Sequence, residues 1–116
     1  MKVSNTTLII ATANNDKAMG TFYSKKLGFK KNKNGGWENA NISVYFDRHN
    51  KAAKKAIEPF RVMLTLAVDD IEKAYKELKK KGVKFVRTPA KEEWGGWFAT
   101  FKDPDGNYLQ IFQYKP

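Results

Sequence analysis

The chain has 116 residues and a net charge of +10, since 22 are Lys or Arg and 12 are Asp or Glu, and its length suits one domain around a single core. It has no cysteine, which excludes disulfide scaffolds, thiolate metal sites and thiol nucleophiles. No apolar run approaches the roughly 18 residues of a membrane span and the first residues lack a signal-peptide pattern, so we expect a soluble cytoplasmic protein with no membrane partner.

The first half of the chain is predicted to fold as a strand, a helix and further strands. Residues 7–12 are β-branched and apolar, which favours a strand. Asn14 and Asn15 are typical helix caps, and the apolar residues after them follow a helical spacing that ends at Gly28. Three short segments then read as strands, namely 29–32, 35–38 and 42–46.

The second half repeats this order. Residues 62–68 read as a strand, Asp69 and Asp70 offer a helix cap, and the following helix is predicted to end at Gly82. Strands are then expected at 83–86, 97–102 and 108–114, the last two joined by an Asp-Pro-Asp-Gly turn. The repeat predicts an α+β protein of two βαβββ modules.

The two modules are expected to form one domain spanning 1–116. The first module covers about 1–47, a connector covers about 48–61, and the second module covers about 62–116.

Several motifs in this order resemble the vicinal oxygen chelate superfamily, which includes glyoxalases, extradiol dioxygenases and bleomycin-resistance proteins. They are Phe22-Tyr23 before Leu27-Gly28-Phe29, the stretch from Val68 to Ala74, Trp94-Gly95, and Phe101 to Asn107. The resemblance covers nearly the whole chain. It implies a curved mixed sheet with a concave cleft, and a homodimer.

The enzymes of that superfamily hold a divalent metal with His and Glu side chains. In this sequence, the position that resembles the last-strand glutamate is Gln110, and the one that resembles the histidine of the second module is Met63. The single histidine, His49, lies in the connector. We therefore predict no metal and no cofactor, and the chain most resembles the metal-free bleomycin-resistance-like members.

Strand alternation predicts which side chains line the cleft. For the strand at 97–102 two registers stay open, because glycines 95 and 96 make its phase ambiguous: either Trp97, Ala99 and Phe101 face the cleft, or Phe98 and Thr100 do. The predicted ligand-binding residues are aromatic or uncharged: Trp37, Tyr45, Met63, Thr65, Trp94, Trp97, Tyr108, Gln110 and Phe112.

These residues favour a metal-independent protein that binds an aromatic or planar organic compound, and no catalytic residue is assigned. One alternative is a lyase, isomerase or dioxygenase-like enzyme of the same superfamily with an atypical site, or an enzyme that uses Glu38, Tyr45 or Asp47 as acid or base. A further alternative is nucleic-acid binding through the basic surface. We do not expect specific nucleic-acid binding, because the lysines are spread along the chain and only three arginines are present.

Overall fold

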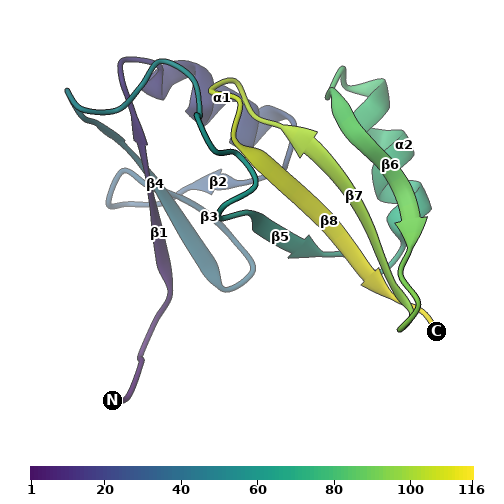
Figure 1. The fold of residues 1–116 in the computed structure, drawn as a ribbon. Coiled ribbons are helices and arrows are strands. Elements are labelled where there is room, and N and C mark those ends of the chain that lie inside the picture. Colours follow the sequence, from purple (N-terminus) through teal and green to yellow (C-terminus); the bar gives the residue numbers. More distant parts are fainter. The chain divides into compact units, whose positions relative to one another are not determined.

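The structure, a computed structural model, describes the whole chain from Met1 to Pro116. The chain divides into two compact units, Met1–Lys54 and Lys55–Pro116. Each unit has the same element order of strand, helix and three strands, and each contains one four-stranded mixed sheet (Figure 1). The predicted fold class, α+β with two βαβββ modules, is confirmed.

The first unit packs one helix against one face of its sheet. Met19 and Tyr23 of the helix are fully buried, and the Tyr23 ring lies 4.9 Å from that of Phe46. The strand order is β1-β4-β3-β2, with β1 parallel to β4 and the other pairs antiparallel. The elements are β1 (Thr7–Thr12), α1 (Asp16–Lys25), β2 (Lys30–Lys31), β3 (Trp37–Asn39) and β4 (Ile42–Arg48).

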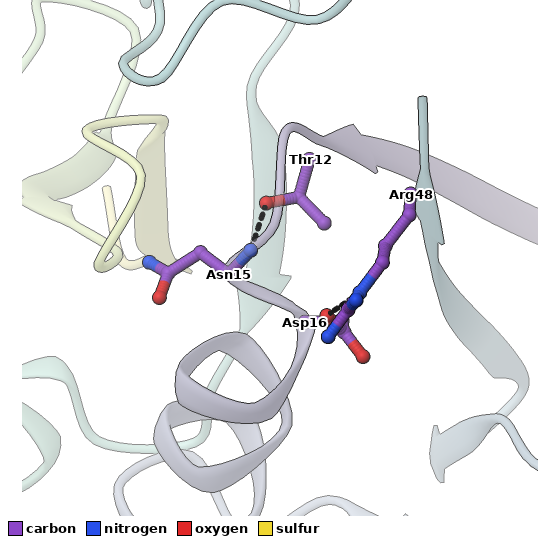
Figure 2. A network of polar contacts seen from close by, with 4 residues as sticks. All are labelled: Thr12, Asn15, Asp16 and Arg48. Atoms are coloured by element: carbon purple, nitrogen blue, oxygen red, sulfur yellow. Dashed lines mark hydrogen bonds and ion pairs between the residues drawn. The ribbon is translucent and has the colours of Figure 1, made fainter. Parts of the chain in front are cut away.

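Helix α1 begins differently from the prediction. Asn15 occupies the N-cap position, but its side chain makes no capping hydrogen bond. Instead, the buried Thr12 hydroxyl accepts a hydrogen bond from the Asn15 backbone N–H at 3.1 Å, which fixes the turn into the helix (Figure 2). Asp16 in the first turn accepts a hydrogen bond from Arg48 Nε at 2.6 Å, so an ion pair ties α1 to the end of β4 (Figure 2).

This ion pair predicts a pH dependence of stability. The hydrogen bond from Arg48 is the main reason why the pKa of Asp16 lies below its ordinary value of 3.8. A lowered folded-state pKa contributes stability that is present above the unfolded-state pKa and is lost as the pH falls through the folded-state value. We expect Asp16→Asn to lower the melting temperature slightly at pH 7, and this difference to shrink as the pH falls below the ordinary value of 3.8 and through the lowered pKa of Asp16.

Thermal unfolding of both proteins across the acid range measures this effect. Asp47→Asn is the matched control, because Asp47 is an exposed carboxylate next to Arg48 in sequence that forms no part of the ion pair. An equal melting-temperature loss in the two variants would contradict a specific role for the Asp16–Arg48 contact.

The second unit has the same topology, with strand order β5-β8-β7-β6 and β5 parallel to β8. Its helix lies against one face of the sheet (Figure 1). The core lies between them, where Ile71, Phe101, Leu109 and Ile111 are at most 2% exposed. The predicted helix cap is confirmed, since the Asp70 side chain accepts a hydrogen bond from the Lys73 backbone N–H. The elements are β5 (Leu64–Ala67), α2 (Ile71–Lys80), β6 (Phe85–Lys91), β7 (Gly96–Lys102) and β8 (Tyr108–Tyr114).

Strand β6 is longer than predicted. The sequence places a strand at 83–86, whereas β6 runs from Phe85 through Pro89 to Lys91. Proline is compatible with this position because β6 is the edge strand, and the pairing with β7 shifts register twice between Phe85 and Ala90.

The predicted turn between β7 and β8 is built on a buried carboxylate. Asp103 is 5% exposed, and its Oδ1 accepts hydrogen bonds from the backbone N–H groups of Asp105 and Asn107. Its Oδ2 accepts a third bond from Asn107 Nδ2 at 2.8 Å, and Gly106 takes the positive φ of 80° that the turn requires. The turn fixes the start of β8 and thereby which of its side chains face away from the helix. Neither α1 nor α2 has the length and apolar character needed to span a membrane.

Candidate ligand-binding site

The sheet of the second unit has two chemically different faces. Directly paired residues of neighbouring strands share a face, so the pairs Phe98↔Phe112 and Thr100↔Gln110 lie on the side away from α2. Thr65 pairs with Gln110 and belongs to the same side. We call this side the open face of the second unit. The side chains on it that could contact a ligand are Thr65, Trp94, Phe98, Tyr108, Gln110, Phe112 and Tyr114.

Four aromatic rings gather on this open face. The rings of Phe98 and Phe112 lie 4.9 Å apart, and the Trp94 ring lies 6.0 Å from Phe98 and 6.1 Å from Phe112. Trp94 and Tyr114 are nearly parallel, with an interplanar angle of 16° and ring centroids 6.3 Å apart. Each of these two residues is 58% exposed, so large apolar rings are presented to solvent rather than used as core.

Gly96 explains why the Trp94 ring can lie over the sheet. A Cβ atom added at Gly96 would come 2.3 Å from Trp94 Cη2 and 2.6 Å from Cζ3, which no real Cβ tolerates. The indole therefore lies directly against the backbone at the start of β7. Any larger residue at position 96 would displace it.

A polar pair lies beside the aromatic rings. Thr65 Oγ1 donates a hydrogen bond to Gln110 Oε1 at 3.0 Å. Because Oε1 accepts this bond, the NH₂ group is the part of the Gln110 amide that can donate to a ligand. The arrangement offers hydrogen bonding without formal charge next to an apolar surface.

The far end of the open face is formed by Tyr108. Its ring meets Phe60 edge to face at 4.6 Å, and Lys102 Nζ lies 5.9 Å from its centroid. Phe60 was not among the predicted site residues, because it lies in the connector, where no periodic pattern marks it. Met63 is half-buried and lies one residue before β5, so it stands at the edge of the face rather than within it.

Trp97 lies on the other side of the sheet from Gln110. It pairs with Gln113, whose side chain bonds the backbone of Asp69 and Ile71 at the start of α2. Lys115 Nζ lies 4.8 Å above its ring. Of the two registers left open by the sequence, the structure has the one that puts Phe98 and Thr100 beside Gln110, so Trp97 is separated from the other predicted residues by strand alternation.

Trp37 and Tyr45 are likewise separated within the first unit. Trp37 pairs with Val44 and faces α1, where a Cβ added at Gly20 would come 2.9 Å from its ring. Tyr45 follows Val44 in β4 and therefore faces the opposite side, where its ring lies across Gly36. The two residues, both predicted to line one cleft, thus lie on opposite faces of the sheet.

A local repeat accounts for the placement of these tryptophans. In both units a glycine carbonyl directly before a tryptophan accepts the hydrogen bond that closes a hairpin. The Asn32 N–H donates to the Gly36 carbonyl oxygen, and the Glu92 N–H donates to the Gly96 carbonyl oxygen, each at 2.8 Å. Gly35 and Gly95 both have positive φ, and their backbone N–H groups donate to the carbonyl oxygens of Asn32 and Glu92, respectively. The Gly-Gly-Trp sequences at 35–37 and 95–97 were the signal for equivalent hairpins, and sequence reasoning missed it.

The residues present do not fit the divalent metal that the family resemblance implies for its enzymes. No group of three or more His, Cys, Asp or Glu side chains is arranged to hold a metal ion. The paired positions on β5 and β8 supply a hydroxyl and an amide, from Thr65 and Gln110. His49 lies in a loop, where its Nδ1 accepts a hydrogen bond from the Lys51 backbone N–H.

Comparisons with known proteins agree with the architecture. A sequence model described as Glyoxalase/Bleomycin resistance protein/Dioxygenase superfamily matches residues 8–111. The Uncharacterized protein YraH of Bacillus subtilis (strain 168) is 36% identical over 64 residues, which are 52% of this chain and 50% of that protein. The match therefore spans about half the length of this relative.

Solved structures show the same fold. A glyoxalase/bleomycin resistance protein/dioxygenase from Nocardioides has a TM-score of 0.78 at 21% identity, covering 98% of this chain and 85% of that one. A putative glyoxalase family protein from Bacillus anthracis has a TM-score of 0.77 at 17% identity, covering 99% and 98% of the two chains. At these identities the likeness concerns the fold alone.

Proposed function

Because the chain belongs to the Glyoxalase/Bleomycin resistance protein/Dioxygenase superfamily, we propose that it is a metal-independent member that binds an aromatic or planar organic compound on the open face of the second unit. The observation that carries the proposal is the nearly parallel, exposed pair of Trp94 and Tyr114 beside Phe98 and Phe112. Exposed apolar patches with polar neighbours are typical of ligand sites.

The chemistry of this face supports a flat, uncharged contact region in the ligand. Stacking on Trp94 and Tyr114 removes aromatic surface from water, which contributes roughly 25 cal/mol for each Å² buried. The Gln110 amide, held by Thr65, can donate to a carbonyl or hydroxyl group at the edge of the ligand. Affinity then comes from the rings and orientation from the amide.

A ligand panel tests this proposal directly. Planar aromatic compounds are expected to raise the melting temperature, and saturated ring compounds of equal size are not, because only the former stack on the indole. Indole N–H signals in ¹⁵N NMR spectra then show which of the three tryptophans responds. The proposal fails if no aromatic compound stabilises the protein, or if the Trp94 signal stays unchanged on binding.

Metal independence gives a second prediction. Amide and hydroxyl side chains are poor substitutes for imidazole and carboxylate as ligands of Zn²⁺, Ni²⁺ or Fe²⁺. We expect the purified protein to contain no stoichiometric metal, and EDTA to change neither its melting temperature nor its affinity for aromatic ligands. Elemental analysis and thermal unfolding with and without chelator measure this, and a melting-temperature loss that added metal restores would contradict it.

The proposal also includes a cytoplasmic location and a homodimer, and of these two the homodimer is what the family resemblance implies. Light scattering behind size-exclusion chromatography distinguishes a dimer of the 116-residue chain from a monomer. If the protein is a monomer at all concentrations used for ligand binding, the homodimer is contradicted. The proposed binding on the open face does not depend on this result.

A further inference from the structure

A hollow lies in the first unit, on the side of its sheet that faces α1. It has a volume of about 520 Å³ and is bordered by α1, by Lys31 of β2 and by Trp37 of β3. We call it the α1 hollow. Its volume falls within the range of roughly 300–1,000 Å³ that small organic ligands occupy in proteins. It shares no residue with the open face of the second unit.

One wall of the α1 hollow is a flat ring. The Trp37 indole lies against α1 at Gly20, where an added Cβ would come 2.9 Å from Trp37 Cζ2. Phe46 adds apolar surface to the lining. Gly35 borders the hollow as well, and a Cβ there would meet no atom within 4 Å, so the space on that side is open.

The charge around the ring is positive. Lys17, Lys25 and Lys31 border the α1 hollow, and Lys31 Nζ lies 5.7 Å from the Trp37 ring centroid. The single carboxylate in the lining is Asp16, and its charge is balanced by Arg48 at 2.6 Å. Three lysines thus border the hollow, and the one carboxylate in its lining is already paired with Arg48.

We propose that the α1 hollow is a second binding site, which takes a planar aromatic anion: a flat ring that carries a carboxylate or a phosphate group. The ring stacks on Trp37, and the anionic group lies among Lys17, Lys25 and Lys31. This ligand differs in charge from the one proposed for the second unit, and the site differs in location.

The experiment uses the full chain and follows the Trp37 indole N–H signal by ¹⁵N NMR. The probes are 2-naphthoate, its uncharged analogue 2-naphthamide, and adenosine monophosphate. We expect 2-naphthoate to shift the Trp37 signal with an affinity that falls as salt is added, and 2-naphthamide to bind several-fold more weakly. A response to adenosine monophosphate but not to 2-naphthoate would assign the site to phosphate-bearing rings, and the reverse would assign it to carboxylates.

Lys30 and Lys31 provide a matched pair of variants. They are neighbours in β2, but only Lys31 borders the α1 hollow, since Lys30 pairs with Glu38 on the opposite face. Lys31→Gln is expected to weaken binding about threefold, whereas Lys30→Gln, with the same change in net charge, leaves it unchanged.

Three outcomes would overturn the proposal: no shift of the Trp37 signal by any anion, equal binding of 2-naphthoate and 2-naphthamide, or equal effects of Lys30→Gln and Lys31→Gln. Trp94→Ala separates this site from the proposed function. If Trp94→Ala binds the anion as the wild-type protein does and Lys31→Gln binds it more weakly, the α1 hollow is supported as the anion site. This conclusion holds whether or not the open face binds a ligand.

Discussion

Trp94→Ala is expected to weaken binding of planar aromatic ligands by about tenfold or more, because the variant removes the largest stacking surface of the open face. Its melting temperature should change little, since Trp94 is 58% exposed and contributes little to the core. Calorimetric titration of the ligand that stabilises the wild-type protein measures the affinity, and thermal unfolding measures the stability.

Two companion variants make this test specific. Trp94→Phe keeps a ring and should retain part of the affinity. Gly96→Ala keeps the indole but displaces it, because the new Cβ would stand 2.3 Å from Trp94 Cη2, and it should weaken binding nearly as much as Trp94→Ala. Unchanged affinity in both Trp94→Ala and Gly96→Ala would exclude this face as the binding site.

Phe101→Ala is expected to lower the free energy of unfolding by about 3–5 kcal/mol. Phe101 is fully buried between the sheet of the second unit and its helix, and its ring packs 5.5 Å from that of Phe85. Because small proteins are stable by only about 5–15 kcal/mol, this loss is large. Denaturant unfolding measures it, and Val86→Ala on the exposed surface of β6 is a control expected to cost less than about 1 kcal/mol.

The same variant tests the predicted single domain of residues 1–116. The chain contains two compact units, and Trp37 reports on the first while Trp94 and Trp97 report on the second. If the chain unfolds as one domain, Phe101→Ala shifts the transition of all three indole signals equally. A shift confined to Trp94 and Trp97 would show that the units unfold separately and would contradict the single-domain prediction.

Much of the fold was predictable because its signals are local. Gly28 and Gly82 end the two helices with φ values of 77° and 86°, and Asp70 caps α2, as the sequence indicated. The Asp-Pro-Asp-Gly turn likewise depends on residues within a few positions of one another. Such signals act over one turn of chain and need no knowledge of distant partners.

The faces of the strands were harder to predict, because they depend on pairing between distant segments. A shift of one residue exchanges the two faces of a strand. In β7 the glycines at 95 and 96 left open whether Trp97 or Phe98 faces the same side as Gln110. Only the pairing of Trp97 with Gln113 and of Phe98 with Phe112 decides this. The α1 hollow was not predicted either, since its lining brings α1 together with Trp37 of β3 and Phe46 of β4, which no local sequence pattern connects.

The repeated hairpin carries a different side chain at its tip in each unit. Its hydrogen bonds align 32 with 92 and 36 with 96, so Asn34 stands where Trp94 stands in the other unit. Tyr45 beside Gly36 corresponds to Tyr114 beside Gly96. The same backbone thus presents a polar amide in one copy and an indole in the other. A change of side chain at this one tip position therefore alters the surface that a unit presents without altering the hydrogen bonds that hold the hairpin, because those bonds join backbone atoms only.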